Sequence, residues 1–115
     1  MGGYLTTHVL DTVHGAPASG VAITLCDGDG TAIARGTTNA DGRLDAPILG
    51  GHAFRPGRYT LEFEAGDYFR RLGMTLPEPA FLDTVVIAFG IADGASHYHV
   101  PLLISPYGYS TYRGS

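Results

Sequence analysis

The chain has 115 residues, of which 44% are apolar and only 16% are charged, and its formal net charge is −4. This size and composition predict one globular domain over residues 1–115, and the acidic balance argues against a protein that binds nucleic acid through a basic stripe. The sequence shows no apolar run of membrane-spanning length and no signal-peptide pattern, so we expect a cytoplasmic protein with no membrane partner.

The first predicted strand runs from Tyr4 to Thr12, with Thr6 and His8 on one face and Val9 on the other. Alternating or continuous apolar runs between turn residues predict further strands. They span residues 21–25, 31–38, 44–49, 59–64, 81–91, 97–104 and 109–113. The run 81–91 is almost entirely apolar, which is expected of a strand covered on both faces. Cys26, the only cysteine, follows the second run, so we expect a buried or half-buried thiol and no internal disulfide.

Two Gly-containing turns and one helix complete the predicted elements. Residues 27–30 (Asp-Gly-Asp-Gly) predict a hairpin turn, because Asp-Gly tolerates the positive φ that such turns require. An EF-hand calcium loop is excluded, since Thr31 occupies the third ligand position and no glutamate closes the loop. The turn at residues 39–42 delivers Arg43, and residues 66–73 form the only plausible helix.

Short strands, regular turns and one short helix predict an all-β sandwich. The chain contains no lysine, so its seven cationic side chains are all arginines. Because so few charges leave little protection for exposed strand edges, we expect self-association to cover part of the surface.

Four features are candidates for chemistry: His8, Arg43, His99 and the Ser115 terminus. His97 and His99 lie two residues apart in a predicted strand, so both rings share one face. The opposite face of that strand is apolar and must be the core, so the histidine face points outward, toward solvent or a partner subunit. Whether His8 meets His99 does not follow from the sequence.

Each candidate also has an ordinary structural interpretation. A strand histidine is commonly a hydrogen-bonded surface residue, an arginine after a turn is commonly solvated, and a terminal serine is commonly frayed. His14 and His52 lie in predicted turns and are expected at the surface. The remaining arginines, at positions 35, 55, 58, 70 and 71, are expected to be solvated or ion-paired. Three histidines could bind zinc, but no cysteine or acidic residue lies close to His97 and His99. A Ser-His-Asp triad lacks a serine on a nucleophile elbow.

Four sequence blocks in this order resemble the transthyretin-like 5-hydroxyisourate hydrolases. The blocks are residues 5–11 (LTTHVLD), 39–43 (NADGR), 97–103 (HYHVPLL) and 112–115 (YRGS). The terminal tetrapeptide is the signature of these hydrolases, and the hormone-carrying transthyretins lack it. The resemblance extends from about Tyr4 to Ser115.

This resemblance implies a sandwich of two four-stranded sheets, assembled into a homotetramer with active sites in a channel between subunits. It implies hydrolysis of 5-hydroxyisourate in the breakdown of urate toward allantoin, with no metal or organic cofactor. Carried over by position, the catalytic set is His8, Arg43, His99 and Ser115. The substrate-binding set contains these four residues and adds Tyr112, Arg113 and Gly114.

Chemistry and resemblance agree on a mechanism, and two other functions stay open. A histidine that titrates near neutrality can take a proton from water and return it to a leaving ring nitrogen, and Arg43 can bind carbonyl oxygens with its planar fork. His8 and His99 are expected to share the proton transfers.

One alternative function is that of a non-enzymatic transthyretin-like carrier of a hormone-type small molecule. The polar histidines and the arginine argue against it. Another is a structural β-sandwich that binds protein partners.

Overall fold

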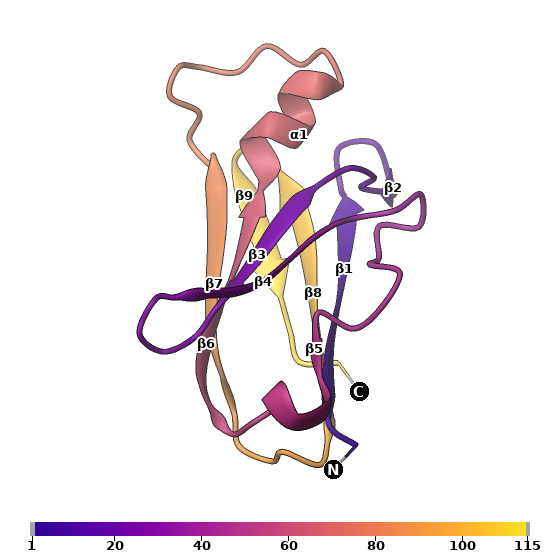
Figure 1. The fold of residues 1–115 in the computed structure, drawn as a ribbon. Helices are drawn as coiled ribbons and strands as arrows, with labels where there is room; N and C mark the ends of the chain where they lie inside the picture. Colours follow the sequence, from indigo (N-terminus) through magenta and orange to yellow (C-terminus); the bar gives the residue numbers. More distant parts are fainter. Residues whose placement is uncertain (1, 115) are drawn as a thin grey trace.

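Two β-sheets packed face to face form the molecule, with one short α-helix at one end (Figure 1). The computed structural model describes residues 2–114, so the predicted role of Ser115 lies outside the described residues. The strands in chain order are β1 (Tyr4–Asp11), β2 (Ala16–Pro17), β3 (Ala22–Cys26), β4 (Ala32–Thr37), β5 (Leu49–Gly50), β6 (Gly57–Glu64), β7 (Thr84–Ile91), β8 (His97–Ser105) and β9 (Gly108–Thr111). The helices are a 3-10 turn, η1 (Gly51–Ala53), and α1 (Ala65–Arg71). No helix of this described part is long and apolar enough to cross a membrane.

The all-β prediction is confirmed, and the two sheets differ slightly from the expected pair of four-stranded sheets. One sheet has the order β4-β3-β6-β7, and the other has the order β2-β1-β8-β9 with β5 also paired to β1. The second sheet has a fifth strand because β2 and β5 pair with opposite ends of the same strand, at Leu10–Asp11 and at Tyr4–Leu5. In the middle of this sheet β1 and β8 run parallel, and all the other pairs are antiparallel.

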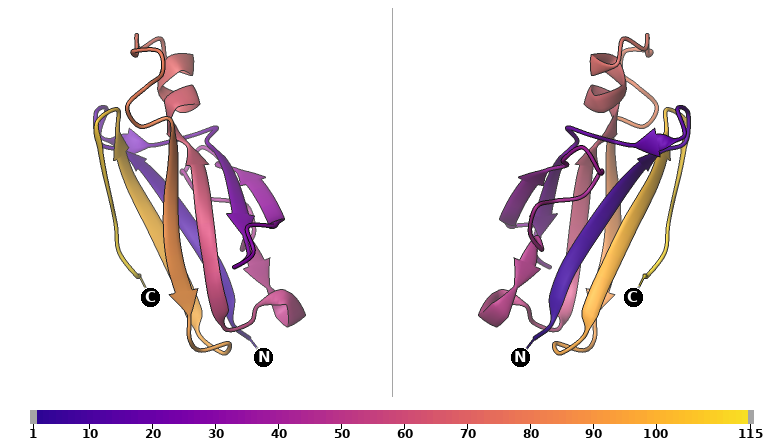
Figure 2. Two further views of the ribbon diagram at one scale, coloured as in Figure 1. Left: turned by 90° about the vertical axis from the view of Figure 1, so that its left-hand side faces the viewer. Right: turned by 90° about the vertical axis from the view of Figure 1, so that its right-hand side faces the viewer.

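The core lies between the sheets, as the side view shows (Figure 2). In β8 the inward residues Tyr98, Val100, Leu102 and Ile104 are all at most 7% exposed, while His97 and His99 on the other face are half-buried. This pattern confirms the predicted inward apolar face and outward histidine face of the strand. Burial of these side chains is the main driving force that holds the two sheets together.

Two predicted strands differ from the structure. Residues 44–48 form no strand, and only Leu49 pairs with β1, since Pro47 has no amide hydrogen to donate to a sheet. The strand predicted at 81–91 begins at Thr84 and is covered on one face only, because the second sheet packs on the inner face of β7 and no described element covers the outer face. Val86 on that outer face is 47% exposed. The prediction of a strand covered on both faces is therefore wrong for the single chain.

The predicted turns and helix are present. Residues 27–31 form the hairpin turn, in which the amide of Gly30 donates to the carbonyl of Asp27. The helix α1 spans Ala65–Arg71, one residue earlier at its start than predicted, and Arg70 forms ion pairs with Asp67 and Asp83. Cys26 is buried, as expected.

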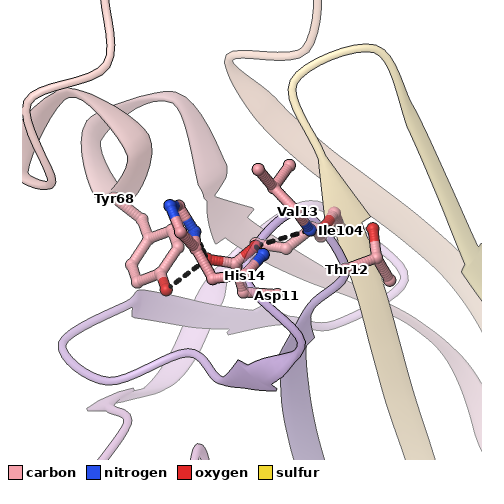
Figure 3. Close-up of polar contacts among 6 residues, drawn as sticks. All are labelled: Asp11, Thr12, Val13, His14, Tyr68 and Ile104. Atoms are coloured by element: carbon pink, nitrogen blue, oxygen red, sulfur yellow. Dashed lines mark hydrogen bonds and ion pairs between the residues drawn. The ribbon is translucent and has the colours of Figure 1, made fainter.

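A buried carboxylate ties α1 to the end of β1 (Figure 3). The side chain of Asp11 accepts hydrogen bonds from the Tyr68 hydroxyl at 2.8 Å and from the amides of Val13 and His14 at 2.9 and 3.1 Å. Nδ1 of His14 lies 2.6 Å from Oδ2 of Asp11, the oxygen that also accepts from Tyr68, so the partly exposed His14 ring has a hydrogen-bond partner within the chain. Burial opposes ionisation of Asp11, but these hydrogen bonds outweigh it and lower the pKa of the carboxyl below its ordinary value. Burial and the Asp11 charge in turn raise the pKa of Tyr68.

Removing the Tyr68 hydroxyl tests this anchor. Tyr68→Phe should lower the free energy of unfolding by about 1.5–3 kcal/mol at neutral pH, the range for a hydrogen bond to a charged group, measured by urea unfolding. Because the pKa of Asp11 is lowered in the folded state, the charged anchor stabilises the protein above pH 3.8 and is lost as the pH falls below that value. The cost of the substitution should shrink over the same range.

Tyr59→Phe is the matched control, since the Tyr59 hydroxyl donates at 2.7 Å to the uncharged carbonyl of Arg55. This control should cost about 0.5–1.5 kcal/mol with no such pH dependence. Equal costs and equal pH profiles for the two substitutions would contradict a charged anchor.

Candidate functional site

The parallel pairing of β1 with β8 brings the predicted histidines together on one outer face. In this ladder Thr6 lies opposite His99 and His8 lies opposite Pro101, so His8 is two positions along β1 from the residue that faces His99. Period-two alternation in both strands then points Thr6, His8 and His99 to the same side. The structure thus answers the question that the sequence left open, because His8 and His99 are diagonal neighbours.

The turn before Arg43 places this residue beside His8. The carbonyl of Gly42 accepts a hydrogen bond from the amide of Val9 at 2.8 Å, and Arg43 forms an isolated antiparallel bridge with His8. Gly42 has φ +76° and a Cβ here would collide with the carbonyl oxygen of Val9, so the turn requires glycine. Opposed residues in an antiparallel bridge share a face, and Arg43 therefore joins the histidines.

Arg43 and His99 line a cavity of about 240 Å³ on the outer face of the sheet. Its lining consists of Thr6, Thr7, Arg43, Leu44, Ala46, His97 and His99. His8 lies outside this lining, and its Nε2 is 2.8 Å from the carbonyl oxygen of Asp41. A carbonyl only accepts hydrogen bonds, so Nε2 of His8 carries the proton and Nδ1 is the nitrogen left for chemistry.

His97 and His99 are joined by a threonine. The Thr6 hydroxyl lies 2.7 Å from Nε2 of His97 and 2.8 Å from Nδ1 of His99. The ring of Tyr4 stacks on that of His97, with centroids 4.2 Å apart and planes 13° apart. The two rings are therefore held in defined orientations before any ligand binds.

Electrostatics keep His99 neutral. Burial lowers the pKa of His99, and the positive charge of Arg43 lowers this pKa further, as do His97 and His8 whenever their rings are protonated. A lowered pKa means that His99 stays unprotonated below its ordinary value of 6.5. The stability linked to its neutral form is present above pH 6.5 and is lost as the pH falls from there toward the folded-state pKa.

The C-terminal segment runs along the other edge of β8. The amide of Gly114 donates to the carbonyl of His99 at 2.7 Å. A Cβ at Gly114 would come within 2.8 Å of Cδ2 of His99, so glycine is required where this segment passes the ring. Gly114 is thus brought to the site, as predicted, and the next residue, Ser115, is outside the described part.

The structure places Tyr112 and Arg113 apart from this cavity. The guanidinium of Arg113 lies 4.2 Å from the centroid of the Tyr98 ring, on the core side of β8, and donates to the carbonyl of His97 at 3.3 Å. Tyr112 is 62% exposed and, with Arg113, lines a separate cavity of about 240 Å³ between the edges of the two sheets. Within one chain, the two contacts of Arg113 therefore hold the C-terminal segment against β8.

Sequence reasoning left Thr6, His97, Leu44 and Ala46 out of the candidate set. Alternation could have found the first two, since it already placed Thr6 on the face of His8 and His97 on the face of His99. No comparable signal marks Leu44 or Ala46, which lie in an irregular segment. Residues 2–114 contain no group of three or more His, Cys, Asp or Glu side chains arranged to hold a metal ion, so the zinc alternative gains no support.

Arg43→Gln should raise the pKa of His99 toward its ordinary value, because a nearby positive charge that opposes protonation is removed. The pKa should stay below 6.5, since burial is the larger cause of the shift. An NMR titration of the histidine rings measures the pKa of His99 directly. Arg58→Gln, an exposed arginine of the other sheet, is the control and should leave His99 unchanged. Identical His99 titrations in the two variants would show that Arg43 does not act on the ring.

Gly114→Ala should either displace the His99 ring or detach the C-terminal segment, because the added methyl group has no room. We expect faster hydrogen exchange of the amide at position 114 and a loss of roughly 1–3 kcal/mol, as for other overpacked sites. Gly108→Ala is the matched control in the same tail, since its Cβ would meet its nearest neighbour at an ordinary 3.7 Å. Protection at position 114 as strong as in the parent protein would refute the close packing.

Comparison with known proteins places this site in a family. A family model described as HIUase/Transthyretin family matches residues 5–114. The 5-hydroxyisourate hydrolase of Mesorhizobium japonicum is 63% identical over 99% of this chain and 94% of its own length. The one from Pseudomonas aeruginosa is 61% identical over 98% of this chain and 92% of its own length.

Solved structures agree with the sequence relatives. The Klebsiella pneumoniae 5-hydroxyisourate hydrolase has a TM-score of 0.83 and 39% identity, covering 97% of this chain and 99% of its own. An (S)-allantoin synthase matches with a TM-score of 0.92 and 44% identity over 98% of this chain, which spans 44% of that longer chain. Sea bream transthyretin in complex with thyroxine has a TM-score of 0.84 and 32% identity, covering 96% of this chain and 93% of its own. The chain therefore belongs to the HIUase/Transthyretin family.

Proposed function

We propose that this protein hydrolyses 5-hydroxyisourate to 2-oxo-4-hydroxy-4-carboxy-5-ureidoimidazoline in the breakdown of urate toward allantoin. The observation that carries the proposal is the 63% identity, over nearly the whole length, to a protein named 5-hydroxyisourate hydrolase. The geometry fits this chemistry, since His8, Arg43 and His99 gather on one outer face around a cavity.

His99 is the residue best suited to activate water. It is neutral at and below neutral pH, because burial and neighbouring positive charges lower its pKa, and a neutral imidazole can accept a proton. Water that loses its proton to His99 attacks a carbonyl carbon of the substrate, and the protonated ring then supplies a proton to the leaving ring nitrogen. His8 shares the site through its Nδ1, the nitrogen not used by the Asp41 carbonyl.

Arg43 stabilises the negative charge that develops on a carbonyl oxygen of the substrate. Its exposed guanidinium offers several donors in one plane, which suits the carbonyl oxygens of a flat substrate. When water attacks a carbonyl, the oxygen becomes anionic, and a fixed cation beside it lowers the barrier to reaction. The same positive charge that stabilises this oxygen also keeps His99 unprotonated.

The C-terminal motif completes the proposal. The amide of Gly114 is hydrogen-bonded to the carbonyl of His99. The proposed role of Ser115, the next residue in the sequence, is to orient His99 or the attacking water with its hydroxyl or terminal carboxylate. Arg113 and Tyr112 take part in substrate binding by fixing this segment and by closing the site in an assembled oligomer. The Arg113 contact with Tyr98 supports the fixing role.

The same proposal includes a homotetramer with its active sites in a channel between subunits, in the cytoplasm. Both sheets end in an uncapped edge strand, β7 and β9, and these strands and the tail expose the apolar side chains Val86, Tyr109 and Tyr112. Unpaired edges of this kind favour pairing with a second copy. A site on the outer face of a sheet excludes water better when another subunit covers it.

A carrier of a hormone-type small molecule is the second candidate, favoured by the likeness to sea bream transthyretin in complex with thyroxine. That likeness is 32% in identity, about half the 63% identity to the Mesorhizobium japonicum hydrolase. Two histidines and an arginine around the cavity suit a polar reactant better than an apolar cargo.

The direct test generates 5-hydroxyisourate from urate with urate oxidase and follows its ultraviolet absorbance with and without this protein. The compound decays unaided, so the expected result is an acceleration proportional to the protein concentration. His99→Asn should lower the accelerated rate by about a hundredfold or more, since it removes a general base. Size-exclusion chromatography with light scattering should show both proteins as tetramers.

His52→Asn is the control, because His52 is exposed in η1 and lines a different cavity from that of His99. Saturable binding of a thyronine-like ligand, together with no acceleration by the untagged tetramer, would favour the carrier instead. Full activity in His99→Asn would refute the mechanism while leaving the hydrolase function in place.

A further inference from the structure

One hydroxyl group lies between two imidazole rings at the floor of the cavity. Thr6 is opposite His99 in the β1–β8 ladder, and its Oγ1 is 2.8 Å from Nδ1 of His99 and 2.7 Å from Nε2 of His97. All three side chains are half-buried, so water replaces these contacts poorly. Thr6 therefore links the two histidine rings directly.

The number of protons available to Thr6, His97 and His99 couples the tautomers of the two histidine rings. A hydroxyl group carries one proton, and a neutral imidazole carries one N–H and one lone pair. With both rings neutral and both hydrogen bonds formed, Thr6 donates to one ring and accepts from the other. If Nδ1 of His99 carries its proton, then Nε2 of His97 is bare, and the reverse holds as well.

We propose that Thr6 is a positioning residue that sets the tautomer of His99. Its hydroxyl accepts from Nδ1–H of His99 and donates to Nε2 of His97, which leaves Nε2 of His99 unprotonated and ready to accept a proton from water. This inference rests on the proposed hydrolase function for its catalytic consequence, while the tautomer itself is a property of the free protein.

The proposed role of His99 as a base selects this direction of the hydrogen bonds over the reverse. Thr6 engages Nδ1 of His99 in either direction, so Nε2 is the ring nitrogen left to meet water, and it accepts a proton only when it carries none. The guanidinium of Arg43 shares the cavity with His99 and opposes a second proton on this ring. His8 and His97 are the other titratable groups that act on the ring, and they add no negative charge. The stack of Tyr4 on His97, with centroids 4.2 Å apart, restricts the plane of the His97 ring.

The test compares Thr6→Val, which keeps the shape and removes the hydroxyl, with Thr6→Ser, which keeps the hydroxyl. Heteronuclear NMR of the ring nitrogens should show His99 protonated at Nδ1 in the parent protein and in Thr6→Ser. Thr6→Val should shift the proton of His99 toward Nε2 and lower kcat by roughly tenfold or more, with KM little changed, because a general base contributes about a hundredfold or more. Thr12→Val, which removes a threonine hydroxyl bonded to the carbonyl of Ile104, should alter neither property.

Two results would overturn the proposal: a parent protein in which His99 is protonated at Nε2, or Thr6→Val with the parent kcat and the parent spectrum. Should Thr6→Val not fold, the parent spectrum and Thr6→Ser still decide. Failure of the proposed function gives a different result, in which the parent protein does not accelerate the decay of 5-hydroxyisourate at all. The ring-nitrogen spectra then still determine whether Thr6 sets the tautomer.

Discussion

The parallel ladder between β1 and β8 is the constraint on which the rest of the structure depends. Eight residues of each strand pair in one register, from Tyr4 with His97 to Asp11 with Ile104. Because side chains alternate, this register builds the core on one face and the histidine site on the other at the same time. A slip by one residue would expose the core residues and bury the histidines. The core packing that stabilises this register therefore also fixes the geometry of the site.

Parallel strands are usually covered on both faces, and β1 and β8 are covered by the second sheet on only one. Their outer face carries half-buried polar groups beside apolar ones. These polar groups have partners within the chain, as in the Thr6 bridge and the bond from His8 to the Asp41 carbonyl. An outer face of this kind fits the ligand and the covering subunit that we propose.

The two ends of β1 have different roles. At its C-terminal end the buried Asp11 gathers the Tyr68 hydroxyl, two backbone amides and the His14 ring, which fixes α1 against the sandwich. Nearer its N-terminal end Thr6 and His8 take part in the candidate site. The family likeness extends over a transthyretin bound to thyroxine as well as over hydrolases, so the sandwich alone does not determine activity. The hydrolase chemistry that we propose rests instead on side chains of the outer face.

The sequence by itself determined which face of β8 is buried and that His97 and His99 point outward, because alternation along a strand is a local property. It also indicated the turn at 39–42 that delivers Arg43, through its Asp-Gly pair. Only the tertiary structure decided that Thr6 faces His99, that Arg43 lies beside His8 and that Arg113 turns toward Tyr98. Thr6 and His97 are 91 positions apart, and their contact depends on strand register, which no local pattern specifies. The coverage of β7 was mispredicted because the layers that pack on a strand are likewise decided by the tertiary arrangement, and the second sheet covers only its inner face.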